Sequence, residues 1–203
     1  LGNHVQVGGV GYLSGDEAGG AFLTRRTFQA VYDELYRVGE KTSMTKELFE
    51  KFDIPSKEDY LAKIVDISMS GKLNRTEIIQ MLFRHANNGD KVAKSVLSTA
   101  GRCMGLSVAG CINNLNFQGT TYVVLAGSVW ANAAAPDMFD SFKEVIEKNV
   151  KNECEYIVLK VAPACGALVW AMELANKKLP DEAMREKILI NVENYQKTQA
   201  GTK

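Results

Sequence analysis

The stretch that decides the fold runs from Thr121 to Trp130 and reads TYVVLAGSVW. β-Branched and aromatic side chains dominate its first six residues, which predicts a strand over Thr121–Ala126. Gly127 and Ser128 follow the strand directly. A glycine at this place either makes a tight turn into a helix or lets a flat ligand approach the backbone at the carboxyl end of a parallel strand. The residues alone leave both interpretations open.

The same order of elements occurs again further along the chain. A helix is predicted where apolar residues recur from Phe139 to Ile146, and a second strand is predicted over Tyr156–Val161. The small residues Ala164–Ala167 then lead into another helix. Two strand–helix units in series predict an α/β fold, with a parallel sheet that is covered by helices.

Upstream of these units the chain is predicted to be helical. Apolar residues from Phe28 to Val38 recur every three or four positions, as on one face of a helix. Residues 42–86 are expected to form an all-α insertion of short helices, the last of which spans Asn74–Ala86. Gly89 suits a left-handed helix stop, and Asp90 suits the N-cap of the next helix.

That next helix is the longest one predicted. Its apolar residues step by three or four from Ala93 to Leu115, and it contains Gly101, Gly105 and Gly110. Each glycine costs about 1 kcal/mol relative to alanine in a helix interior. We therefore expect another element to pack closely against this helix and to offset the cost.

A glycine-rich segment precedes the first helix. Residues 8–20 read GGVGYLSGDEAGG. The carboxylate of Asp16 could accept hydrogen bonds from free amides as the N-cap of the following helix. It could equally accept them from vicinal sugar hydroxyls. Both roles fit the residues, and the helix cap is the simpler one.

Composition excludes several classes of protein. The chain has 203 residues, of which 46% are hydrophobic, and its 24 basic side chains balance 24 acidic ones. A net charge of zero argues against nucleic-acid and membrane-surface partners, which normally require a basic excess. No apolar run approaches the roughly 20 residues of a membrane span. We expect a cytoplasmic protein.

Familiar catalytic and metal-binding motifs are absent from the sequence. It has no Walker phosphate loop, no dinucleotide-binding fingerprint, no zinc-binding His-Glu-x-x-His and no serine-hydrolase elbow. Its four cysteines form no Cys-x-x-Cys pair, and only two histidines accompany them. We therefore expect free thiols in a reducing compartment and no metal site.

Five short motifs together resemble those of one family. They are GGVG at 8–11, GDEAG at 15–19, ANNGD at 86–90, GSVW at 127–130 and ACGA at 164–167. In this order they resemble the C-terminal lobe of a sugar kinase in the actin-like ATPase superfamily. The chain is most similar to the family that joins N-acetylglucosamine kinases with the BadF/BadG/BcrA/BcrD ATPases.

The resemblance implies roles for particular residues. Asp16 would bind hydroxyls of the sugar, and Val10 stands where the kinases place a sugar-contacting tryptophan, which leaves the identity of the sugar open. Ala86, Gly127 and Ser128 would line the adenosine end of the nucleotide. The Gly166–Ala167 pair would lie in the helix at the interdomain hinge.

The resemblance also implies a fold and a division of the chain. The expected fold is the α/β C-terminal lobe of an actin-like (ribonuclease H-like) ATPase domain, with a helical insertion at 42–86 and an incomplete sheet. This lobe would span 1–179. Residues 180–203 would form an amphipathic helix, Asp181–Gln196, and a tail.

The implied function is that of an ATP-dependent amino-sugar kinase that uses magnesium and phosphorylates N-acetylglucosamine or glucosamine. The family's aspartate base and phosphate loops would lie upstream of Leu1, so the catalytic residues of this chain are unknown. We expect the chain to be an inactive fragment that packs with a second copy or with the missing N-terminal lobe. Two alternatives stay open: an ATPase activator of a radical dehydratase or reductase, for which Cys165 is suggestive by position, and a non-catalytic sugar sensor.

Overall fold

The computed structural model describes residues 3–71, 73–127, 129–130 and 135–200. Contacts divide the chain into two units. The first comprises Leu1–Thr121 and Ala133–Cys154, and the second comprises Tyr122–Asn132 and Glu155–Lys203. This division rests on contacts alone, and the boundary expected near residue 180 stays a prediction.

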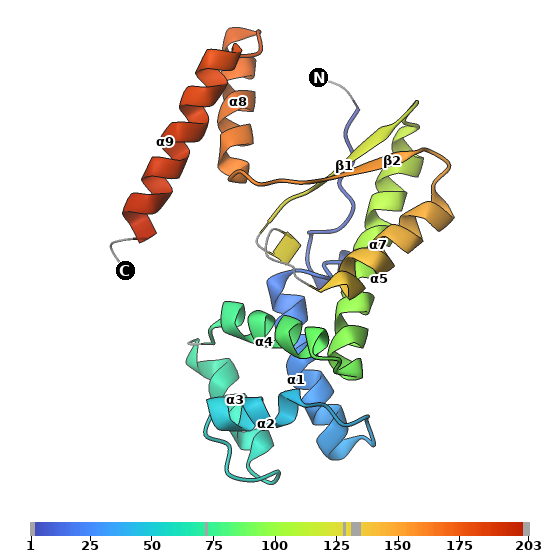
Figure 1. The fold of residues 1–203 in the computed structure, drawn as a ribbon, viewed down its shortest axis with the longest axis vertical. Helices are drawn as coiled ribbons and strands as arrows, with labels where there is room; N and C mark the ends of the chain where they lie inside the picture. The colour runs from blue at the N-terminus through green and yellow to red at the C-terminus, as the bar shows by residue number, and fades with distance from the viewer. Residues whose placement is uncertain (1–2, 72, 128, 131–134, 201–203) are drawn as a thin grey trace. The chain divides into compact units, whose positions relative to one another are not determined.

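The first unit is built from helices (Figure 1). After the short 3₁₀ turn η1 (Tyr12–Ser14), its helices are α1 (Gly20–Tyr36), α2 (Met44–Lys51), α3 (Tyr60–Ser70), α4 (Arg75–Asn87), α5 (Lys91–Leu115) and α7 (Pro136–Asn149). Their buried side chains form the core of this unit, with Leu23, Leu48, Leu82, Leu97 and Phe142 among those that are fully enclosed.

Close packing of α5 against α7 explains two of the three glycines in the long helix. A Cβ atom added at Gly101 would lie 2.0 Å from the carbonyl oxygen of Met138, and one added at Gly105 would lie 2.7 Å from that of Phe142. Both distances are shorter than any real contact of a Cβ atom. The backbones of α5 and α7 can therefore touch here only because glycine has no side chain. The close packing predicted at these glycines is confirmed.

Length and composition alone would also let α5 cross a membrane, and α5 is the one described helix of which this is true. In the structure its buried face packs against α1, α4 and α7 of the same chain. The core helix of a globular unit passes the same test of length and composition, so this feature is weak evidence for a membrane span.

The predicted helices between residues 42 and 86 are present, and the last of them lies one residue later than predicted, at 75–87. Asn74 caps α4 by accepting from the backbone N–H of Glu77, and Gly71 ends α3 in the left-handed conformation at φ 65°. Gly89 has φ 92° and Asp90 caps α5, as predicted. One boundary is wrong: α1 ends at Tyr36, and Val38, which was placed on its apolar face, is fully exposed.

The second unit contains all but the first residue of each of the two described strands, which pair in parallel. They are β1 (Thr121–Leu125) and β2 (Cys154–Val158). Their ladder runs from the bond of Thr121 N–H to Glu153 O, at 2.8 Å, to that of Leu159 N–H to Leu125 O, at 2.9 Å. The α/β class is confirmed, but the second strand ends earlier than predicted because β1 offers no partner beyond Leu125.

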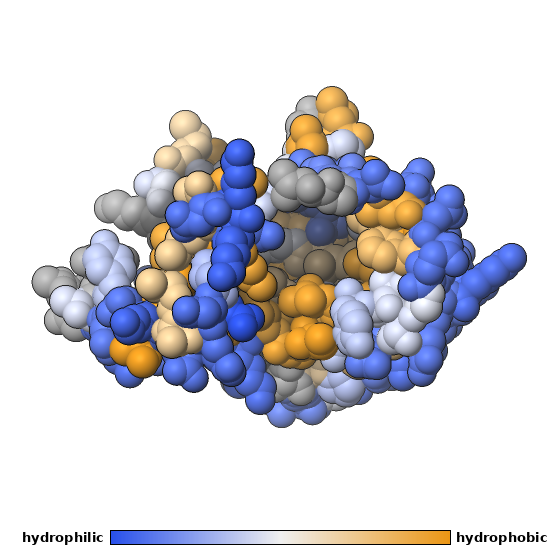
Figure 2. Space-filling view, turned by 90° about the horizontal axis from the view of Figure 1, so that it is seen from above, coloured by the Kyte–Doolittle hydropathy of each residue, from blue (hydrophilic) through white to orange (hydrophobic). Residues whose placement is uncertain are grey.

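Two helices complete the second unit. They are α8 (Pro163–Asn176) and α9 (Glu182–Ala200), which pack on each other. Of the apolar positions expected on the last helix, Ile188 is buried, whereas Met184 and Tyr195 are exposed. Figure 2 shows apolar side chains, in orange, at the surface beside hydrophilic ones.

Candidate functional site

The glycine-rich segment folds into a loop that only glycine can form. Gly8, Gly9, Gly11 and Gly15 all have positive φ angles, between 72° and 92°. A Cβ atom added at Gly8 would lie 2.8 Å from the carbonyl oxygen of Gly15. The backbones of Gly8 and Gly15 therefore approach each other too closely to admit a side chain at Gly8.

The tip of the loop is exposed. Ser14 closes the 3₁₀ turn η1 with two bonds to the carbonyl oxygen of Gly11, one from its N–H and one from its hydroxyl, each 3.1 Å long. Val10 lies beside this turn and is 71% exposed. An exposed aliphatic side chain is therefore presented where the family motif carries an aromatic one.

Asp16 does not cap the first helix, so the simpler of its two predicted roles is wrong. α1 begins four residues later, with Gly19 as its N-cap and no side-chain cap. The left-handed conformation of Ala18, at φ 74°, separates Asp16 from the helix by turning the chain. Asp16 is exposed, and its carboxylate makes no hydrogen bond or ion pair with any residue that the structure describes. It is free to bind a ligand.

The loop lies against the middle of α5. Burial, followed by the nearby carboxylate of Glu17, raises the pKa of the Cys103 thiol on that helix. Cys103 is therefore a neutral thiol at the base of the loop. It is free and half-buried, and the prediction of a free thiol is confirmed for this cysteine.

The ANNGD segment lies where α4 meets α5. Ala86 is fully buried in α4. Asp90 accepts four hydrogen bonds, from Ala93 N–H at 2.9 Å, from the hydroxyls of Thr42 and Ser43 at 2.7 Å each, and from Ser43 N–H at 2.6 Å. The motif therefore joins the start of α5 to the segment before α2.

These bonds determine the ionisation of Asp90. Burial raises its pKa, but the hydrogen bonds from Ala93, Ser43 and Thr42 together outweigh burial and hold the pKa below the ordinary value. Asp90 is thus a structural carboxylate. Sequence reasoning recognised its cap but missed Thr42 and Ser43, because nothing in the chain signals a contact across 47 or 48 residues.

A second polar chain continues from Ser43. Its hydroxyl lies 2.6 Å from His85 Nδ1, and His85 Nε2 lies 2.8 Å from a carboxylate oxygen of Glu47. A serine, a histidine and an acid in line resemble a hydrolase triad. However, the carboxylate of Asp90 contacts the same serine hydroxyl, and it would repel the oxyanion that acyl transfer produces. The network links α2 to α4.

Gly127 follows β1 with φ 108°, and a Cβ atom added there would meet no described residue within 4 Å. Both predicted roles of Gly127, the tight turn and the approach of a ligand, stay predictions. Ser128 lies outside the described residues. Ala86 belongs to the first unit and Gly127 to the second, so the predicted adenosine site stays a prediction.

The ACGA segment forms the first turn of α8. Gly166 and Ala167 are exposed, and a Cβ atom at Gly166 would meet nothing within 4 Å. Cys165 is buried. Across the described ranges no three His, Cys, Asp or Glu side chains gather as metal ligands.

Comparison with known families agrees with these motifs. The model of the BadF/BadG/BcrA/BcrD ATPase family matches residues 1–171. The chain belongs to this family. The resemblance seen in the sequence is thereby confirmed, and the match includes the glycine-rich loop, the ANNGD segment and the strand β1 that precedes Gly127.

One curated relative is an N-acetylmuramic acid/N-acetylglucosamine kinase from Clostridium acetobutylicum. It is 26% identical to the chain over 173 residues, which are 84% of this chain and 55% of the relative. The chain therefore spans about half the length of the kinase that it matches. Family and relative together support a sugar-kinase-like, ATP-binding function.

Proposed function

We propose that the protein carrying this chain is an ATP-dependent kinase of an amino sugar and that Asp16 binds hydroxyls of that sugar. The observation that carries this proposal is the position of Asp16. It lies between the turn η1 and the start of α1, where it caps nothing and pairs with nothing among the described residues. A carboxylate left free beside exposed backbone is suited to a polyhydroxyl ligand.

In this proposal, separate residues bind the sugar and the nucleotide. The loop at 8–20 and Asp16 orient the sugar, and Gly127 admits the adenosine end of ATP. ATP supplies the phosphoryl group, and its transfer is promoted by alignment and by exclusion of water. No described carboxylates cluster as a magnesium site, and none is proposed as the base. We expect the chain alone to be inactive.

Val10 bears on the choice of sugar. An exposed valine offers no aromatic face on which a sugar ring could stack. We therefore propose N-acetylglucosamine or glucosamine on the strength of the motifs. N-acetylmuramic acid is a third sugar to test, because the name of the relative includes it beside N-acetylglucosamine.

The test is ADP release by the protein that carries this chain, with and without each of these sugars. Release that depends on one of them supports the kinase. Release independent of sugar would contradict it and favour the ATPase activator. A protein that binds both ATP and a sugar but releases no ADP, with or without the sugar, would favour the sensor.

A pair of variants tests Asp16 itself. Asp16→Ala is expected to raise the KM for the sugar about tenfold or more and to leave the KM for ATP and the thermal stability unchanged, since two or more charged hydrogen bonds are lost and no cap is removed. Asp181→Ala is the matched control because this carboxylate does cap a helix, 2.9 Å from Met184 N–H. It should lower stability by about 1 kcal/mol and leave both KM values unchanged. An unchanged sugar KM in Asp16→Ala would refute the assignment.

A further inference from the structure

A pocket of about 260 Å³ lies in the first unit, away from the glycine loop's tip. One face of α1, one face of α3 and the start of α4 line it, with the residues Ala21, Thr24, Arg25, Phe28, Ile64, Ile67, Ser68, Leu73 and Arg75. Since a water molecule occupies about 30 Å³ of liquid, the space is large enough for a small organic ligand.

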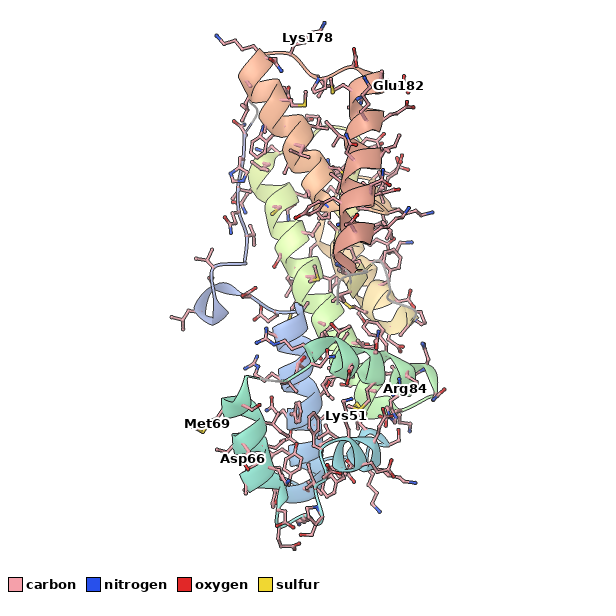
Figure 3. All side chains as sticks on the ribbon, turned by 90° about the vertical axis from the view of Figure 1, so that its left-hand side faces the viewer. Lys51, Asp66, Met69, Arg84, Lys178 and Glu182 are labelled. Carbon is pink, nitrogen blue, oxygen red and sulfur yellow. The ribbon has the colours of Figure 1, made fainter. Side chains whose placement is uncertain are left out.

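The pocket exists because α3 is attached at one end only. Tyr60, in its first turn, is 1% exposed and donates to the carbonyl oxygen of Phe28 at 2.8 Å, and it is the one buried residue of this helix. The later turns of α3 lie over α1 without filling the space between them. Met69 points away from α1 (Figure 3) and is largely exposed.

The walls of the pocket are apolar and its rim is cationic. Phe28, Ile64, Ile67 and Leu73 supply the apolar surface, and Arg25 and Arg75 supply two guanidinium groups. A pocket of this composition suits a ligand with an apolar body and an anionic head.

Neither arginine is neutralised within the part of the chain that the structure describes. Arg25 lies over the ring of Phe22, 5.6 Å from its centroid, and Arg75 has no ion pair. Arg75 is the first residue of α4, where the helix dipole disfavours a cation and favours an anion. The nearby acid, Glu77, is already paired with Lys51 and bonded to Asn74.

The lining of the pocket also includes a polar side chain whose hydroxyl makes no hydrogen bond with any described residue. Thr24 is buried, and its hydroxyl has no hydrogen-bond partner among the described residues. A buried hydroxyl without a partner costs free energy. Because this oxygen is itself enclosed, the hydroxyl does not select the head of a ligand; the two arginines do.

We propose that this pocket binds a small organic carboxylate whose apolar body, a short alkyl chain or a single ring, lies between α1 and α3. The carboxylate is held at the rim by Arg25 and Arg75. The site is distinct from Asp16 and does not depend on the proposed kinase activity.

The probe is octanoate, titrated calorimetrically into the chain, with 1-octanol and acetate as matched controls. Octanoate carries both the apolar body and the charge, octanol lacks the charge, and acetate lacks the body. We expect octanoate to bind at least about tenfold more tightly than either control. Equal binding of octanol, or no binding of octanoate at millimolar concentration, overturns the proposal.

Two variants locate the binding. The double change Arg25→Gln and Arg75→Gln should weaken octanoate binding roughly tenfold and leave octanol unaffected. Ser68→Trp, at an exposed lining position, should block octanoate by filling the pocket. Arg102→Gln, an exposed arginine on α5 outside the pocket, is the control and should bind as the wild type does. Wild-type affinity in both pocket variants would place octanoate elsewhere and overturn the proposal.

Discussion

Two aspartates of the same unit have opposite roles, although each precedes a helix in the sequence. Asp90 is surrounded by four donors and caps α5, whereas Asp16 has no partner among the described residues and precedes a helix that begins without it. The difference arises at Ala18, whose left-handed backbone turns the chain before α1 starts. The backbone at Ala18 therefore separates a carboxylate that is left without a partner among the described residues from one that caps a helix.

The pKa of Asp90 predicts sensitivity to acid. Because its pKa is lower in the folded state than in the unfolded one, ionised Asp90 stabilises the fold above the ordinary value of 3.8. That contribution is lost as the pH falls through the lower, folded-state pKa. Asp90→Asn should therefore lower the melting temperature near neutral pH and reduce its decline between about pH 5 and pH 2.

Thermal unfolding monitored by circular dichroism across this pH range measures the effect. Asp16→Asn removes one carboxylate from an exposed position and controls for the change in net charge. If Asp90→Asn unfolds with the same pH profile as the wild type, the four hydrogen bonds do not stabilise the charged form.

The glycines of the loop allow a second test at the scale of single residues. Gly8→Ala and Gly9→Ala each place a side chain at a positive φ angle, 81° and 72°, at a cost of about 1–2 kcal/mol. Only Gly8→Ala also presses a methyl group against the carbonyl oxygen of Gly15, because the nearest atom to a Cβ added at Gly9 is Gln6 Nε2, 3.5 Å away.

We therefore expect Gly8→Ala to be the more destabilising of the two in urea denaturation. It should also raise the KM for the sugar more than Gly9→Ala does, since it displaces the loop that precedes Asp16. Equal effects on stability would mean that the contact between residues 8 and 15 does not hold the loop.

At the scale of elements, the contact between α5 and α7 organises the first unit. Gly101 allows the two backbones to touch, whereas Gly110 on the same helix has its nearest neighbour, Val7, 3.8 Å from an added Cβ atom. These two glycines have the same helical conformation and differ in their surroundings. They form a matched pair for measuring the packing.

Gly101→Ala should destabilise the chain by about 1–3 kcal/mol, since α7 must move to admit the methyl group. Gly110→Ala should stabilise it by up to about 1 kcal/mol, since alanine favours the helix and fits the space. Chemical denaturation of both variants measures the difference. A neutral Gly101→Ala would show that the helices separate at little cost.

Some boundaries of helices can be predicted from the local sequence alone. The helix at 91–115 begins and ends where the pattern predicts, and the helix at 75–87 lies one residue from the predicted 74–86, because their caps, Asp90 and Asn74, are local signals. The second strand was predicted less well. Its length depends on how far β1 runs beside it, and no pattern within residues 156–161 contains that information.

At the scale of the whole molecule, the second unit exposes apolar side chains that a small fold normally covers. Tyr122 and Val124 on β1, Ile157 on β2 and Trp170 on α8 are all between 44% and 62% exposed. The two described strands leave an open edge on each side of their sheet. Surfaces of this kind favour association.

We expect the isolated chain to self-associate as its concentration rises, and Trp170→Lys to reduce the association by removing apolar area. Val38→Lys is the control, since it replaces a fully exposed residue of the first unit. Sedimentation velocity over a range of concentrations measures the effect. A chain that remains monomeric throughout would contradict the prediction.

The sequence by itself determined the α/β class, the long helix with its caps and the family, because these depend on periodicity, on local capping residues and on motifs that are contiguous in the chain. The tertiary structure decided the rest. It released Asp16 from the helix cap, joined Asp90 to Thr42 and Ser43, and placed Arg25 and Arg75 at the rim of one pocket. The physical reason is that these outcomes depend on backbone turns and on contacts between distant residues, which local patterns do not specify.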